Sequence, residues 1–192
     1  MSGAASAEES SPFSWGSGAM ASGRPLAGEF GVHAEDDIAR VAGDDAVEAL
    51  SRQQREVEEL LRGLDEGVIA GKRYAPGKWT VKEVIGHMCD DERIFAYRML
   101  CIARGDTSPL ESFDENAYVA GANFEERSLN SLLEEYRLIR ASTIALLRSL
   151  SPEAWHRRGT AAGYTASVRG LAWHIAGHEL HHLEILKTRY FA

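Results

Sequence analysis

The chain has 192 residues, of which 44% are hydrophobic and 26% are charged, as expected for one globular domain with some additional tail. Its formal net charge of -8, from 29 acidic and 21 basic residues, argues against a nucleic-acid-binding protein, because neutralising phosphates requires a basic surface. No apolar run is long enough to cross a bilayer, so a membrane protein is also excluded.

Residues 1–28 are rich in glycine, serine and alanine and show no apolar periodicity. We expect a disordered N-terminal tail there and a folded domain over residues 29–192. The tail lacks the basic start and continuous apolar core of a signal peptide. Cys89 and Cys101 lie about 18 Å apart along one predicted helix and cannot form a disulfide with each other. We therefore expect a reduced, cytoplasmic protein.

Apolar residues spaced three, four or seven positions apart predict four amphipathic helices, at about 45–64, 80–105, 128–150 and 167–187. Thr80 and Glu83 match the capping box at the start of the second helix, and Ser128 is a good N-cap for the third. No long strand alternation and no internal repeat is visible. The predicted fold is therefore all-α, a four-helix bundle.

The connection over residues 106–127 is long for a compact domain. Such connections are usually functional or contain short helical turns, and a crossover between two helices that run in the same direction also needs this length. Pro152 follows a serine cap and predicts a short helical turn. Residues 157–166 are polar and contain glycine, and we interpret them as a loop.

Histidines gather in the fourth predicted helix, at positions 174, 178, 181 and 182. His174, His178 and His182 form one stripe, because residues four apart share a helix face, and an i,i+4 pair can bind one metal ion. The whole stripe rises about 12 Å, so a further ligand must come from elsewhere. A solvated or core-capping cluster is the alternative. His87, which alone resembles a buried core histidine, is the natural third ligand beside this cluster.

Four stretches carry a family resemblance: Ala75–His87 (APGKWTVKEVIGH), Glu92–Arg98 (ERIFAYR), Phe113–Asn116 (FDEN) and Gly177–His182 (GHELHH). In this order they resemble the DinB-like superfamily, also called the YfiT-like metal-dependent hydrolases, over about residues 35–190. The resemblance implies a four-helix bundle with an up-down-down-up course and a long crossover between helices two and three. It also implies a divalent metal held by three histidines, which by position are His87, His178 and His182.

The resemblance does not fix the roles of the two extra histidines. His181 lies about 100° around the helix from His182, so both cannot point at one ion from ideal positions. His174 lies a full turn before His178 and is placed to line a pocket or to contact a ligand. We expect both residues to be secondary to the three ligands.

Three neutral histidines leave open positions on an ion, which is typical of a catalytic site, where a bound water becomes a nucleophile. Zinc and nickel both suit imidazole, so the ligand type does not choose between them. Asp91 and Asp90 follow His87 by four and three positions. Either is placed to orient a ligand or to face the open position, and a solvated surface acid is the alternative. Asp91 is our first candidate catalytic residue.

Glu179 is the second candidate, because residues 178–182 fit the H-E-x-x-H pattern of zinc proteases, in which the glutamate is the base. Few residues follow His182, so the usual downstream third ligand has no room and a protease is disfavoured. We expect a hydrolase that uses metal-activated water on an unidentified small molecule. A metal-dependent thiol S-transferase, an activity found among relatives, and a non-catalytic, stress-associated metal-binding bundle are the alternatives.

The second predicted helix is apolar on more than one side, as Phe95, Tyr97, Met99 and Leu100 show. Such a helix needs a second burial partner. That partner is either the 106–127 connection or another subunit, and we favour a homodimer.

Overall fold

The computed structural model describes residues 23–192. Residues 1–22, which hold most of the predicted disordered tail, lie outside this range. Residues 23–28, also assigned to the tail, contact the domain: the Arg24 guanidinium donates to the carbonyl oxygens of Ile38 and Val41, both at 2.7 Å, and lies 4.4 Å from the centre of the Trp173 ring. The ordered domain therefore includes this segment.

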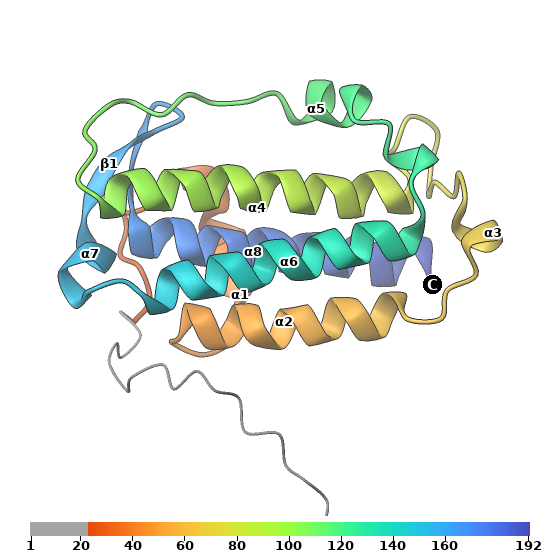
Figure 1. Cartoon of the computed structure of the whole chain (residues 1–192), viewed down its shortest axis with the longest axis horizontal. Helices are drawn as coiled ribbons and strands as arrows, with labels where there is room; N and C mark the ends of the chain where they lie inside the picture. The colour runs from red at the N-terminus through yellow and green to blue at the C-terminus, as the bar shows by residue number, and fades with distance from the viewer. Residues whose placement is uncertain (1–22) are drawn as a thin grey trace, which may run out of the picture.

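Four long helices form the bundle: α2 (Ala46–Leu61), α4 (Val81–Ala103), α6 (Leu129–Arg148) and α8 (Val168–Ile185). Helices α2 and α8 run in one direction and α4 and α6 in the other, which confirms the up-down-down-up course (Figure 1). Helices α4 and α6 pack side by side, so the connection between them must return along the length of the bundle.

Local capping fixes where each long helix begins. The Asp45 carboxylate accepts the backbone N–H groups of residues 47 and 48, and the Ser167 hydroxyl accepts that of Gly170. Thr80 and Glu83 form the predicted capping box, and Ser128 caps α6 as expected. These side chains satisfy backbone donors that have no partner inside the helix.

The crossover between α4 and α6 contains two short helical pieces, α5 (Glu115–Gly121) and the 3₁₀ turn η2 (Phe124–Glu126). It runs over α4 (Figure 1). The further short elements are η1 (Val32–Ala34), α1 (Glu35–Arg40), α3 (Glu66–Ile69), α7 (Pro152–His156) and the final π-helical turn η3 (Leu186–Tyr190). Within residues 23–192, no helix is both long and apolar enough to traverse a membrane.

Residues 157–166 do not form the loop that the sequence suggested. Strands β1 (Arg158–Ala161) and β2 (Tyr164–Ser167) pair in an antiparallel hairpin. Its turn uses Ala162 and Gly163 at φ of 49° and 81°, the left-handed region that matches a two-residue hairpin turn. Leu110 of the crossover bonds to this hairpin, since its N–H donates to Thr160 at 2.9 Å and its carbonyl accepts from Ala162 at 2.8 Å. These two hydrogen bonds hold the hairpin and the crossover side by side.

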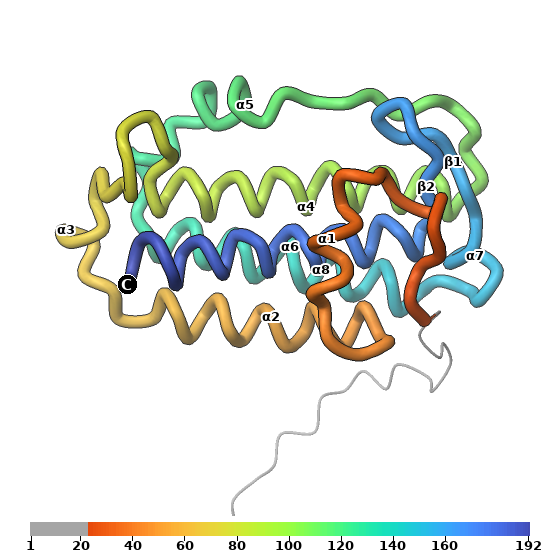
Figure 2. The backbone as a smooth tube through the Cα atoms, turned by 180° about the vertical axis from the view of Figure 1, so that it is seen from behind, coloured from red at the N-terminus to blue at the C-terminus, as the bar shows by residue number. Residues whose placement is uncertain are grey.

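Helix α1 was also absent from the sequence-based prediction. It packs across α8 and lies in front of that helix in Figure 2. A Cβ on Gly177 would lie 2.7 Å from the backbone carbonyl carbon of Asp37, so only glycine permits this close approach. Packing at Gly177 brings His33 and Asp37 beside the histidines of α8.

The centre of the bundle contains a charged network around Arg140 of α6. Its guanidinium donates to Glu92 of α4 at 2.8 Å, to Glu179 of α8 at 3.1 Å and to the Leu50 carbonyl of α2 at 2.9 Å. Tyr136 donates to Glu179 at 2.9 Å. One buried side chain therefore connects all four long helices.

Candidate metal centre and adjoining cavity

Three histidine side chains from two helices converge on one point. The Nε2 atom of His178 lies 3.0 Å from Nε2 of His87 and 3.0 Å from Nε2 of His182. Their candidate ligand atoms all lie within 4.8 Å of one another. Within the described part of the chain, no other group of three or more histidine, cysteine, aspartate or glutamate side chains is arranged in this way. The structure therefore brings together the three residues that the sequence selected.

The spacing of these nitrogen atoms fits a shared ion. Two imidazole nitrogens bound to one ion at about 2.1 Å lie about 3.0 Å apart at a right angle and about 3.4 Å apart in a tetrahedron. His178 and His182 meet this condition because they lie one turn apart on α8, and His87 meets it because α4 packs against α8. The donor set is nitrogen only, which suits a zinc-like or nickel-like divalent ion.

Burial keeps these imidazoles in the neutral form that binds metals. Desolvation lowers the pKa of His87 to about 4 and that of His182 to about 3. Burial, followed by the three nearby histidines on its own helix and His87, lowers the pKa of His178 well below its usual value. At neutral pH the ring nitrogens therefore keep their lone pairs, as metal ligands must.

Asp91 is the acid that reaches this site. Its Oδ2 lies 3.3 Å from Nδ1 of His178, and burial raises the pKa of its carboxyl group to about 8, an effect that the charge of Arg98 opposes. A carboxyl oxygen beside Nδ1 keeps the proton on that nitrogen and leaves Nε2 free for an ion. Asp90, the alternative, instead faces Arg93, at 3.5 Å.

Glu179 does not face the site as a free base. One of its carboxylate oxygens accepts from Arg140 and the other from both Arg140 and Tyr136. The side chain is buried in the charged centre of the bundle and is 4% exposed, so neither water nor substrate reaches it. The structure therefore places the Glu179 carboxylate in the Arg140 network rather than beside the three histidines.

The two extra histidines point in different directions. The His174 ring stacks on Phe95 with ring centres 4.0 Å apart and lies 5.9 Å from the His178 ring. The His181 side chain is 42% exposed, with Nδ1 3.6 Å from a carboxylate oxygen of Asp37. His174 thus lines the space beside the three histidines, whereas His181 faces α1.

Trp79 covers the opposite side of the site, a role that the sequence did not reveal. Its ring centre lies 4.7 Å from that of His87 and 6.5 Å from that of His182, where the rings stack. The Tyr190 hydroxyl donates to the Trp79 carbonyl. Trp79 directly precedes the cap of α4, so its position follows from the capping box, but its contact with α8 depends on tertiary packing.

A cavity of about 380 Å³ opens beside His178 and Asp91. This volume is within the usual range for small-molecule sites. Its walls come from α1, α4, α8, the crossover and the hairpin; besides those two residues they comprise His33, Asp37, Phe95, Arg98, Ser112, Phe113, Asp114, Glu115, Ala162, Tyr164 and His174. Residues 113–115 are the part of the 113–116 stretch that lines the cavity. Tyr118 instead packs on Phe113, with ring centres 5.2 Å apart.

Several solved structures have a similar fold, and two of them illustrate the likeness. YfiT from Bacillus subtilis, described as "a probable metal-dependent hydrolase with an unusual four-helix bundle topology", matches with a TM-score of 0.67 and 17% identity over 74% of this chain and 82% of YfiT. The mycothiol-dependent maleylpyruvate isomerase matches with a TM-score of 0.61 and 17% identity over 72% of this chain. The match spans 57% of the isomerase chain. At such identities the likeness establishes the fold alone.

Comparison of the sequence with curated proteins gives no match. The family model described as the DinB superfamily matches residues 49–186, a range that contains all three converging histidines and most of the bundle. On this match, which confirms the resemblance seen in the sequence, the chain belongs to the DinB superfamily.

Proposed function

We propose that this protein is a metal-dependent enzyme in which His87, His178 and His182 hold one divalent ion, zinc or nickel. The observation that carries the proposal is the convergence of three neutral imidazoles, of which His87 and His182 are buried and His178 lines a cavity of about 380 Å³. Three histidines leave room on an ion for a further ligand, and the cavity gives a small molecule access to it.

Hydrolysis is the reaction that we place first. A divalent ion in this site supplies Lewis acidity and lowers the pKa of a bound water towards neutrality. Asp91 orients His178 and, because it also lines the cavity, is placed to exchange a proton with a substrate. Trp79 shields two of the ligand rings from solvent. The description of YfiT as a probable metal-dependent hydrolase supports this reading.

Thiol transfer is the second candidate. The fold likeness to a mycothiol-dependent isomerase favours it, since a thiolate is a good ligand for a soft, borderline ion such as zinc. A non-catalytic metal-binding bundle is the third, but such a protein has no need of a cavity beside its ion. Cys89 and Cys101 are both free, which is consistent with a reducing, cytoplasmic setting.

Parallel activity screens separate these candidates. The zinc-loaded and nickel-loaded proteins are assayed with ester, amide and phosphoester substrates, and separately with low-molecular-weight thiols plus electrophiles. We expect turnover in the first set that disappears in His87→Ala and persists in His181→Ala. Turnover in the second set alone identifies a transferase. Full metal occupancy without turnover in either set would show that the protein only binds metal.

A further inference from the structure

Arg98 is a buried arginine without an acidic partner. It lies on α4, is 3% exposed and lines the cavity beside the three histidines. Across residues 23–192, no carboxylate oxygen lies within 4.0 Å of its guanidinium nitrogens, whereas buried Arg140 pairs with Glu92 and Glu179. A guanidinium keeps its charge in proteins, and a buried charge without a counterion is unfavourable. The cavity is therefore suited to receive a negative charge.

The surroundings of Arg98 fix its orientation and leave donors free. Its carbon Cζ lies over the Phe95 ring at 4.8 Å and 6.0 Å from the Phe113 ring. The one hydrogen bond that it donates to a described residue goes to the carbonyl oxygen of Glu111, at 2.6 Å. A guanidinium has five N–H donors. Held in this way, the guanidinium presents a pair of parallel N–H donors in fixed positions. The two oxygens of a carboxylate can accept from such a pair at the same time.

The charges around the cavity select a single negative charge. Asp37, Asp114 and Glu115 line its more exposed part and would repel a dianion. The aromatic rings of Phe95 and Phe113 provide apolar walls. A small organic monocarboxylate fits this combination better than a phosphate ester does.

We propose that Arg98 binds the carboxylate of a small organic acid whose other end faces His178. This inference rests on the proposed function and names the substrate class for that site. Seven residues separate Asp91 from Arg98 on α4, a rise of about 10 Å. The carboxylate and the reacting group therefore lie at opposite ends of the molecule, and Arg98 sets which molecules bind rather than performing chemistry.

Binding of phenylacetate, compared with its neutral analogue phenylacetamide, tests the inference. Both are titrated into metal-free and zinc-loaded protein, with affinity measured by NMR on the arginine side-chain N–H signals. We expect phenylacetate to bind about tenfold or more tightly than the amide, with similar affinity in both forms. Equal binding of acid and amide overturns the inference. Binding of the acid only when zinc is present would assign the carboxylate to the ion, overturning the role of Arg98 but not the metal site.

Variants at Arg98 give the second arm. Arg98→Met should lose about tenfold or more in phenylacetate affinity, and Arg98→Lys, which keeps the charge but not the fork, should fall between. Arg93→Met is the matched control, because Arg93 lies on the same helix but pairs with Glu135 outside the cavity. Unchanged phenylacetate affinity in Arg98→Met contradicts the proposal. If Arg98→Met does not fold, the proposal is contradicted when Arg98→Lys binds phenylacetate as tightly as wild type and wild type binds phenylacetate and phenylacetamide equally well.

Discussion

Replacing Arg140 by methionine should destabilise the bundle severely. Arg140 is fully buried and donates to carboxylates on α4 and α8 and to a carbonyl on α2. Its removal leaves the buried carboxylates of Glu92 and Glu179 without their cation. Breaking a buried ion pair from one side costs about 3–5 kcal/mol, because an uncompensated charge remains. We expect a loss of that size in the free energy of unfolding at neutral pH.

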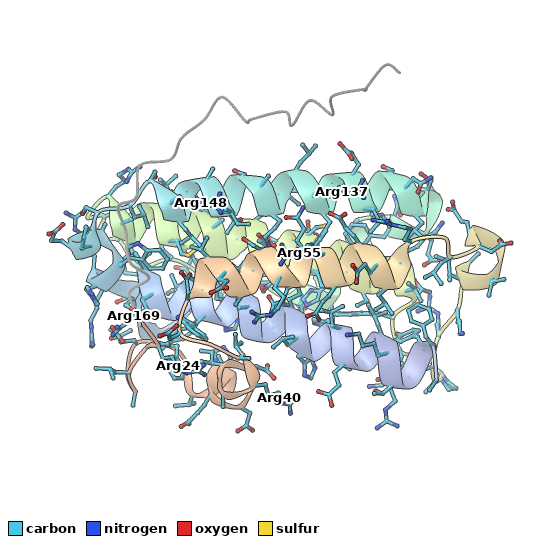
Figure 3. All side chains as sticks on the ribbon, turned by 90° about the horizontal axis from the view of Figure 1, so that it is seen from below. Arg24, Arg40, Arg55, Arg137, Arg148 and Arg169 are labelled. Atoms are coloured by element: carbon cyan, nitrogen blue, oxygen red, sulfur yellow. The ribbon has the colours of Figure 1, made fainter. Side chains whose placement is uncertain are left out.

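Arg137→Met is the matched control for this loss. Arg137 lies on the same helix, is labelled on α6 in Figure 3, and pairs with Glu58 at 3.1 Å, but its side chain is 43% exposed. An exposed ion pair contributes about 1 kcal/mol or less. Urea unfolding of metal-free proteins measures both variants. A loss below about 1 kcal/mol for Arg140→Met, or equal losses for the two variants, would refute the assignment of the network as structural.

The pH dependence of the Arg140→Met loss provides an internal check. Burial raises the pKa of Glu179 even in the intact protein, where Arg140 opposes that rise. Without Arg140 the carboxyl pKa rises further, so the folded variant takes up protons that the unfolded chain does not. Such a group contributes stability at low pH that is lost as the pH rises through the folded pKa. The deficit relative to wild type should therefore be smaller at pH 5 than at pH 8.

Three further predictions concern packing, protonation and assembly. Gly170→Ala should cost about 2 kcal/mol in urea unfolding, because its Cβ would lie 1.8 Å from the carbonyl oxygen of Glu29; an unchanged midpoint contradicts that contact. Burial holds the pKa of His87 at about 4, so this residue should cost the metal-free protein about 3 kcal/mol as the pH falls from about 6.5 to about 4. A loss equally large in His87→Gln refutes this assignment. Tyr97 and Leu100 stay 60% and 39% exposed, so we predict a homodimer by light scattering, which a mass of 21.1 kDa would exclude.

The sequence predicted the features that depend on local physics. The caps at Thr80 and Ser128, the helical periods and the i,i+4 histidine pair all act within a few residues, and the structure confirms the four long helices. The boundaries shifted slightly, since α2 ends at Leu61 rather than Leu64. The family resemblance supplied the up-down-down-up course and supported the choice of His87, which periodicity alone left as a possible core histidine.

Features that depend on distant contacts were missed. Arg140 and Glu92 look like solvated helix residues in the sequence, because only the meeting of four helices buries them. The hairpin turn at Ala162 and Gly163 gives a weak signal, since alanine seldom adopts a positive φ. Helix α1 is too short to show a period. Arg98 formed part of a recognised stretch, but its lack of an acidic partner is visible only in three dimensions.

Metal content of the purified protein tests the central claim most directly. Elemental analysis after loading with zinc or nickel should give one ion per chain for wild type and for His181→Ala, whose side chain faces α1. His87→Ala, His178→Ala and His182→Ala should each lose most of the bound metal while circular dichroism still reports a folded helical protein. Full stoichiometry in folded His87→Ala, or a loss in His181→Ala as great as that in His182→Ala, would contradict the proposed site.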